Sequence, residues 1–415
     1  MTTNSATPTP PADSLPFRIV EKGTLTSPRG FRVGAVCGDI KYGGGRKDVA
    51  LIISDFPAEA AATFTTNQVK AAPVRVSMRR MKRGKMRGVI VNAGNANACT
   101  GVEGLENAKE MVKCAAKAVG CDEREMLVCS TGRIGVQLPM DKVRKAITDA
   151  HAALGDNGHS AAEAIMTTDT FPKELVVEFE LDGATVRIAG IAKGAGMIHP
   201  KMATMLSFIT TDAAIDKATL RSCVQQAVDF TFNRISIDGD TSTNDTVIVL
   251  ANGQAGNETL TSDHKQVGLF QKALQYVMKK LARMIVEDGE GISKIVEVAV
   301  KGGKTMRDAK SAALAVARSM LVKTSWCGED PNWGRLMDAI GYSDARVREE
   351  LVEIYYDGIL AVANGQPSKT PFEQLRKVAQ KKSFTITIQL HLGDGEYNIV
   401  TTDLTEKYVE LNKGE

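Results

Sequence analysis

Hydrophobic positions along this chain follow two different periods, which predict strands in some segments and helices in others. The β-branched apolar runs VALIISDF (49–56) and GVIVNAG (88–94) are typical of buried strands. Apolar residues recur at helical spacing over 103–120, which ends on a glycine suited to a helix C-cap, and again over 140–154. We therefore expect short strands and helices to alternate in the N-terminal part of the chain.

The same mixture continues toward the C-terminus. The segment 174–194 predicts a β-hairpin that turns at Asp182-Gly183. After it we expect a strand at 205–211, a helix at 220–232, a polar segment at 236–246, a strand at 247–251, a long helix near 267–287 and a late hairpin at 384–404. Helices and strands intermix throughout, which places the fold in the α/β or α+β class.

Length, composition and charge limit the function classes. At about 150 residues per domain, 415 residues suit two or three domains or one large α/β unit. The 52 basic and 49 acidic residues leave a net charge of +3, which does not indicate a polyanion partner. Six basic residues gather at 79–87, but no aromatic residues interleave with them, so we expect a solvated helix end and no nucleic acid.

The N-terminal segment and the cysteines bear on location and cofactors. Residues 1–16 are rich in Thr, Pro and Ser without an apolar core, so we expect a disordered tail and no secretory signal. No apolar run approaches the roughly 18 residues of a membrane helix. Seven cysteines without a C-x-x-C pair favour a reducing cytoplasm and no bound metal. No glycine-rich phosphate cradle is visible, and we expect no cofactor.

The segment GAGMIHPKMATML (194–206) carries the most unusual candidate chemistry. Thr204 follows Ala203 at the head of an apolar strand. Threonine is a poor nucleophile without a base, and its own α-amine can serve only if the preceding peptide bond is cut. That amine has a pKa near 8, so part of it is neutral at cytoplasmic pH. The same spacing equally fits a packing threonine at a strand start, which is the commoner case.

Several longer motifs resemble one known family. They are NAGNANACTG (92–101), STGRIG (130–135), IMTTDT (165–170), GIAKGAGMIHPKMATML (190–206), SIDGDTSTNDT (236–246), EDGEG (287–291) and GEDPNWGR (328–335). In this order they resemble the glutamate N-acetyltransferase family, also called ornithine acetyltransferase, of arginine biosynthesis. The resemblance implies a precursor that cleaves itself between Ala203 and Thr204.

The resemblance also implies an architecture. The products of cleavage would be an α chain (17–203, after the tail) and a β chain (204–415) that stay together as one catalytic unit. The expected fold is an α/β, α+β layered sandwich of two stacked sheets flanked by helices. It would be similar to N-terminal nucleophile hydrolases with a different connectivity. Two such αβ units are expected to form a heterotetramer.

Specific residues inherit expected roles from the matching motifs. Thr204 would be the nucleophile that takes the acetyl group as an ester. Thr131 and the backbone of Gly132 would form the oxyanion hole. The substrate-binding residues would be Thr168, Lys193, Thr204, Glu290 and Asn412.

Some of these roles have alternatives. Lys193 would pair with a substrate carboxylate and Glu290 with the ammonium of ornithine, although each alone would be read as an ordinary surface or loop charge. Thr167 or Thr170 could replace Thr168 as the contact. The family carries a terminal Thr or Ser five residues after its Asn, whereas this chain ends three residues after Asn412.

The expected reaction moves acetyl from N-acetylornithine to glutamate, with acetyl-CoA as a slower second donor. Two alternatives stay open. One is an N-terminal-nucleophile aminopeptidase or amidase, in which water takes the acyl group. The other is an unprocessed amino-acid-binding protein that keeps the pocket without the chemistry.

Overall fold

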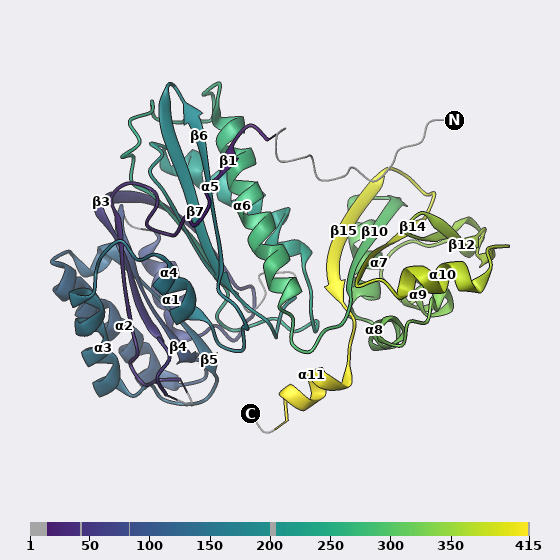
Figure 1. Ribbon diagram of the computed structural model, residues 1–415, viewed down its shortest axis with the longest axis horizontal. Coiled ribbons are helices and arrows are strands. Elements are labelled where there is room, and N and C mark those ends of the chain that lie inside the picture. Colours follow the sequence, from purple (N-terminus) through teal and green to yellow (C-terminus); the bar gives the residue numbers. More distant parts are fainter. Residues whose placement is uncertain (1–14, 42–43, 83, 200–204, 414–415) are drawn as a thin grey trace.

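The computed structural model describes residues 15–41, 44–82, 84–199 and 205–413, and Figure 1 shows a large body joined to a smaller one. The predicted cleavage site, Ala203 and Thr204, lies outside the described residues, as do residues 1–14 of the predicted tail. Leu15 is described, and it packs against the core of the large body.

The large body contains a nine-stranded sheet with helices packed on it. Its strands are β1 (Arg18–Ile19), β2 (Phe31–Val36), β3 (Val49–Phe64), β4 (Met86–Asn95), β5 (Met126–Arg133), β6 (Lys173–Leu181), β7 (Ala184–Lys193), β8 (Leu206–Thr211) and β9 (Thr246–Ala251). Its helices are α1 (Ala72–Arg80), α2 (Gly101–Val119), α3 (Met140–Ala152), α4 (His159–Ile165), α5 (Lys217–Asp229) and α6 (Val267–Glu287).

Strand β3 folds this sheet into two halves. Residues 49–53 pair with β2 and β4, whereas residues 59–64 pair with β9. The change of partner falls around Pro57, which has no N–H to donate and so interrupts the ladder. One strand therefore belongs to both halves, which connects them without a separate linker.

The two halves stack on each other and are covered by helices on their outer faces. Alternate residues of β3, β4 and β5 pack against alternate residues of β7, β8 and β9 in an inner core. The opposite residues of the same strands pack against α5 and α6 on one outer side and against α2 and α3 on the other. This arrangement confirms the expected class of two stacked sheets flanked by helices.

The smaller body contains a six-stranded sheet with its own core. Its strands are β10 (Ile295–Gly303), β11 (Glu353–Tyr356), β12 (Ile359–Ala363), β13 (Gln366–Pro367), β14 (Ser383–Gln389) and β15 (Gly395–Thr402). Its helices are α7 (Met306–Arg318), α8 (Met320–Cys327), α9 (Trp333–Gly341) and α10 (Phe372–Ala379). A last helix, α11 (Glu406–Leu411), runs from this body back toward the large one (Figure 1).

The expected hairpin at 384–404 is wrong. Strands β14 and β15 exist, but β10 lies between them and pairs with both, parallel to β14 and antiparallel to β15. Consecutive strands are neighbours only about two-thirds of the time. Here β10, which begins about 90 residues before β14 in the chain, pairs with β14 along one edge and with β15 along the other. Periodicity cannot reveal that a strand from elsewhere in the chain is inserted between two consecutive strands.

Most other local predictions hold. The hairpin at 174–194 is formed by β6 and β7, and its turn residues Asp182 and Gly183 both have positive φ, at 52° and 78°. Helix α2 ends on Gly120 in the left-handed conformation, as a glycine C-cap requires. Helix α6 spans the expected 267–287, whereas α5 ends at Asp229, three residues before the expected helix end at 232.

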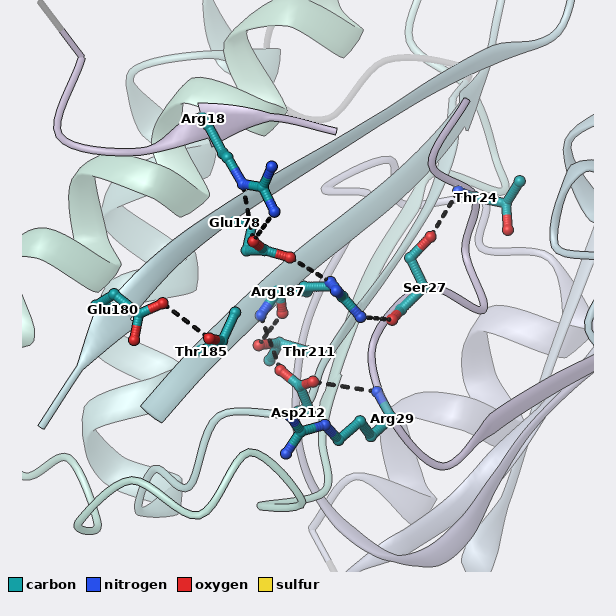
Figure 2. Close-up of polar contacts among 10 residues, drawn as sticks. All are labelled: Arg18, Thr24, Ser27, Arg29, Glu178, Glu180, Thr185, Arg187, Thr211 and Asp212. Atoms are coloured by element: carbon teal, nitrogen blue, oxygen red, sulfur yellow. Dashed lines mark hydrogen bonds and ion pairs between the residues drawn. The ribbon is translucent and has the colours of Figure 1, made fainter. Parts of the chain in front are cut away.

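The segment around Arg18 and Arg29 is tied to the sheet by charged residues (Figure 2). Glu178 on β6 accepts hydrogen bonds from Arg18 and from Arg187, whose Nε lies 2.7 Å from the carboxylate. Asp212 accepts the backbone N–H groups of Arg187 and Arg29 at 2.8 and 3.1 Å. These charged groups all have partners within the fold, so we assign them a structural role.

In the part of the chain that the structure describes, none of the helices combines the length and the apolar character that crossing a membrane requires.

Candidate active site

A cleft of about 490 Å³ brings together segments that are far apart in the sequence. It is lined by Lys41, Arg46, Gly94, Thr131, Gly132, Arg133, Thr167, Thr168, Lys193, Gly196, Met197, Asp238, Asp240, Glu290, Tyr408 and Asn412. Every site residue predicted from the sequence lies in this lining, except the cleavage pair Ala203 and Thr204, which falls outside the described residues.

The two residues predicted to form the oxyanion hole lie together at the end of one strand. Thr131 and Gly132 lie near the end of β5, next to Gly94 and Asn95 on β4. Gly132 has a φ of 128°, and a Cβ there would lie 2.3 Å from the carbonyl carbon of Gly94. Only glycine fits both the torsion and this close approach. The Thr131 side chain is buried at the cleft wall, and none of the hydrogen bonds among the described residues involves its hydroxyl.

Lys193, at the end of β7, belongs to a buried row of charges. Its ammonium lies 3.9 Å from Asp169 Oδ2, and the Lys173 ammonium lies 2.7 Å from Asp169 Oδ1 and 2.5 Å from Asp288 Oδ2. Burial alone would raise the pKa of Asp169, but Lys193 and Lys173 outweigh it and hold that pKa at about 2. Burial lowers the pKa of Lys193, against the attraction of Asp169. The cleft thus has a buried lysine amino group held beside an ionised carboxylate.

Asp169 also holds the loop that follows α4. It accepts the backbone N–H groups of Thr167 and of Gly194, at 2.9 and 2.6 Å. Thr170 donates to Asp288, so its hydroxyl is engaged away from the cleft. Of the three threonines that the sequence left open, Thr167 and Thr168 line the cleft and Thr170 does not.

Glu290 and Asn412 meet at another wall of the cleft. Asn412, just after α11, donates its side-chain amide to Glu290 Oε2 at 2.9 Å. The backbone N–H of Glu290 donates to the carbonyl of Ala195 at 2.9 Å. A Cβ on Gly196 would lie 2.6 Å from the Glu290 carboxylate. Gly196 therefore has to be glycine for the carboxylate to lie against the 194–199 segment.

Asp238 braces the segment that leads toward the predicted cleavage site. Its two carboxylate oxygens accept the backbone N–H groups of Met197 and Ile198, and Met197 has a positive φ of 57°. Tyr408 on α11 donates its hydroxyl to the same carboxylate at 3.4 Å. Burial raises the pKa of Asp238 in spite of these bonds. The small body therefore contributes to the cleft through α11.

The described residues on either side of 200–204 are anchored in the large body. His199 is buried, with Nδ1 3.1 Å from the hydroxyl of Ser236. Met205 donates its backbone N–H to Asp245 Oδ1 at 3.0 Å. Burial raises the pKa of Asp245 well above its usual value. The chain thus enters and leaves this segment at fixed points.

Most of the chain is similar to known proteins. The model of the ArgJ family matches residues 32–414. An arginine biosynthesis bifunctional protein ArgJ from Geobacter sulfurreducens is 50% identical over 386 residues, which cover 92% of this chain and 98% of that protein. One from Symbiobacterium thermophilum is 48% identical over 392 residues, which cover 94% of this chain and 98% of that protein.

The chain belongs to the ArgJ family. This membership confirms the family expected from the sequence motifs, an acetyltransferase family of arginine biosynthesis. Among solved structures, an ornithine acetyltransferase complexed with ornithine from Mycobacterium tuberculosis is 37% identical. That match covers 44% of this chain and 98% of the other, with a TM-score of 0.41. The assignment to the ArgJ family rests on the sequence relatives.

Sequence reasoning missed six charged residues and one tyrosine that line this ArgJ-family cleft or support it. They are Lys41, Arg46, Arg133, Asp169, Asp238, Asp240 and Tyr408. Arg46 stood in YGGGRKD, which the sequence suggested was only a turn. Arg133, Asp169, Asp238 and Asp240 stood inside quoted motifs, so the motifs themselves were the signal that could have found them.

Proposed function

We propose that this chain transfers acetyl from N-acetylornithine to glutamate through an ester on Thr204, after cleaving itself between Ala203 and Thr204. The observation that carries the proposal is the convergence of Thr131, Gly132, Thr168, Lys193, Glu290 and Asn412 on one cleft. These residues come from separate motifs, and the strand that ends at Lys193 leads into the segment of the proposed cut.

Self-cleavage would proceed through the Thr204 hydroxyl. Its oxygen attacks the Ala203 carbonyl carbon, the C–N bond breaks, and the amine of Thr204 leaves with a proton. That step frees the Thr204 α-amine, and water then hydrolyses the resulting ester, which frees the Ala203 carboxylate and regenerates the Thr204 hydroxyl. Strands β7 and β8 flank the cut and pair with each other from Ile188–Thr211 to Lys193–Leu206. The proposed α chain (17–203) and β chain (204–415) would therefore remain in one sheet.

Acetyl transfer would use the same hydroxyl twice. The Thr204 α-amine, with a pKa near 8, accepts the hydroxyl proton as the oxygen attacks the acetyl carbonyl. Thr131 and the Gly132 N–H would stabilise the oxyanion, and the amide C–N bond breaks to release ornithine. The α-amine of glutamate then attacks the acetyl carbon of the ester. The bond from that carbon to the Thr204 oxygen breaks, which regenerates the hydroxyl and releases N-acetylglutamate. Lys193 would bind the α-carboxylate, and Glu290, held by Asn412, the ammonium of ornithine.

Further parts of the proposal are less closely tied to the cleft. Acetyl-CoA would be a slower second donor, two αβ units would form a heterotetramer, and the enzyme would work in the cytoplasm. The relatives are named bifunctional, which suits two donors. Membership of the ArgJ family favours acetyl transfer over the amidase and binding-protein alternatives.

The kinetic pattern tests the shared ester. Initial rates measured at varied N-acetylornithine and glutamate should give parallel double-reciprocal lines, because one covalent intermediate separates the two half-reactions. Intersecting lines would require both substrates to be bound together and would contradict the acetyl-threonine ester. Hydrolysis that proceeds equally fast without glutamate would favour the amidase alternative.

Lys193→Ala should raise the KM for N-acetylornithine and leave self-cleavage intact. The ammonium serves the substrate carboxylate, and losing a charge-assisted hydrogen bond of roughly 1.5–3 kcal/mol corresponds to about tenfold to a hundredfold in KM. The control is Lys117→Ala, at an exposed lysine of α2. An unchanged KM in the Lys193 variant would remove this residue from the substrate site.

A further inference from the structure

The charged residues of the cleft separate into a basic end and an acidic end. The basic end consists of Lys41, Arg46 and Arg133, and the acidic end of Asp238, Asp240 and Glu290. Burial lowers the pKa of Lys41 to about 8; Asp48 and Asp169 act against this shift, and Arg46 and Lys193 add to it. Burial also lowers the pKa of Lys193, on which Asp169, Lys173 and then Glu290 act. Lys193 therefore lies within electrostatic reach of both ends.

The acidic end is a connected group. Asn412 contacts Glu290, and Tyr408 contacts Asp238. Burial is the first cause that raises the pKa of Tyr408, and Asp238, Glu290 and Asp240 add to it. Three carboxylates around one hydroxyl and one amide form a region that favours a cation and repels an anion.

Within the basic end, Lys41 is buried and built into the fold, whereas Arg46 and Arg133 are exposed at the mouth of the cleft. Lys41 is 8% exposed, and its ammonium donates to the backbone carbonyls of Lys47 and Ala164 at 2.6 and 3.0 Å. Both acceptors are neutral and orient the ammonium, while the Asp48 carboxylate, which accepts the Lys41 backbone N–H at 3.0 Å, is its largest charged neighbour. A Cβ on Gly94 would lie 2.8 Å from the Lys41 Cα, so the glycine allows the two backbones to pack closely.

This end continues into a second cavity of about 390 Å³. Lys41, Gly94 and Arg133 line both the cleft and this cavity. Among the described lining of the second cavity, none of the three carboxylates of the acidic end is present. Lys41 and Arg133 therefore border a space that the acidic end does not reach, whereas Arg46 lines only the cleft. The second cavity has a carboxylate of its own, Asp39, which is paired with Lys142. The predicted oxyanion residues Thr131 and Gly132 line the cleft.

The proposed reaction poses a recognition problem that two ends would solve. N-acetylornithine and glutamate both present an α-carboxylate and an α-nitrogen to the same threonine. Their side chains carry opposite charges, an ammonium on one and a γ-carboxylate on the other. A single side-chain pocket lined by carboxylates would repel the γ-carboxylate of glutamate. A single side-chain pocket lined by basic residues would repel the ammonium of ornithine.

We infer that the two substrates place their side chains in opposite ends of the cleft, and that Arg46, Arg133 and Lys41 bind the γ-carboxylate of glutamate. This inference rests on the proposed acetyl transfer. Guanidinium groups suit the task because they bind carboxylates through paired N–H groups. The acidic end keeps the ammonium of the acetyl donor, and Lys193 holds the α-carboxylate of either substrate.

The test compares glutamate with glutamine as acceptor, because glutamine has nearly the same shape without the γ-charge. In Arg46→Gln and Arg133→Gln, the kcat/KM ratio of glutamate to glutamine should fall about tenfold or more, through a higher KM for glutamate. Arg46→Lys and Arg133→Lys should restore part of the preference. Release of ornithine in a single turnover with N-acetylornithine alone should continue.

Controls separate this inference from the proposed function. Arg124→Gln, at an exposed residue paired with Asp122, should keep the wild-type ratio. Glu290→Gln should raise the KM for N-acetylornithine and leave the glutamate preference in place. The inference is wrong if two results are found together. The wild-type enzyme releases ornithine in the single turnover, and the arginine variants show the same kcat/KM ratio of glutamate to glutamine as the wild-type enzyme. If the wild-type enzyme releases no ornithine without glutamate, the proposed ester mechanism itself fails.

Discussion

Thr204→Ala should yield one uncut chain of 415 residues with no acetyl transfer. The substitution removes the only hydroxyl that the account assigns to attack on the Ala203 carbonyl and on the acetyl group, so both reactions stop together. A denaturing gel and intact mass measure the cut, and ornithine release measures the transfer. Because alanine is smaller than threonine and adds no polar group, we expect the variant to fold.

Thr204→Ser is the matched variant, because it keeps the hydroxyl and loses only a methyl group. It should still produce two chains, the second beginning at residue 204. Cleavage of the alanine variant at the same bond would show that another group performs the attack. Retained acetyl transfer by an uncut alanine variant would contradict the nucleophile assignment even more directly.

Thr131→Val should lower kcat by about a hundredfold to a thousandfold, the usual loss when one oxyanion-hole donor is removed. Valine keeps the shape of the buried side chain and removes its hydroxyl. Since the donor acts on charge that develops in the transition state, the KM for N-acetylornithine should change much less than kcat.

Thr63→Val on β3 is the matched control for that measurement. The buried Thr63 hydroxyl has no hydrogen-bond partner in the described structure, so its loss should alter neither fold nor rate. A Thr131 variant with a wild-type kcat would remove this hydroxyl from the oxyanion hole. The backbone of Gly132 would then have to act with a different donor.

The sequence was informative where local chemistry decides the structure. The turn at Asp182-Gly183 and the C-cap at Gly120 need positive φ, and the residues that tolerate it are recognisable. The candidate site residues were also accessible, because their motifs resemble those of one family. Periodicity alone would not have gathered them, since Thr131, Lys193 and Glu290 lie on segments about 60 to 160 residues apart.

Long-range pairing was beyond the sequence pattern. Nothing in the alternation of β3 says that residues on either side of Pro57 pair with different strands, and nothing in β14 and β15 says that β10 separates them. Arg46 was set aside for a similar reason. Its side chain is exposed, as a charge in a glycine-rich turn usually is, and only the fold shows that it lines the same cleft as Arg133 and Lys41.

The intact mass of the purified enzyme, before and after mixing with N-acetylornithine in the absence of glutamate, tests the central claim most directly. We expect two chains, with the fragment 204–415 heavier by one acetyl group after mixing. Adding glutamate should return that fragment to its original mass, and peptide mapping should place the acetyl group on Thr204. A single uncut chain in active enzyme, or a fragment that never gains the acetyl group, would contradict the account.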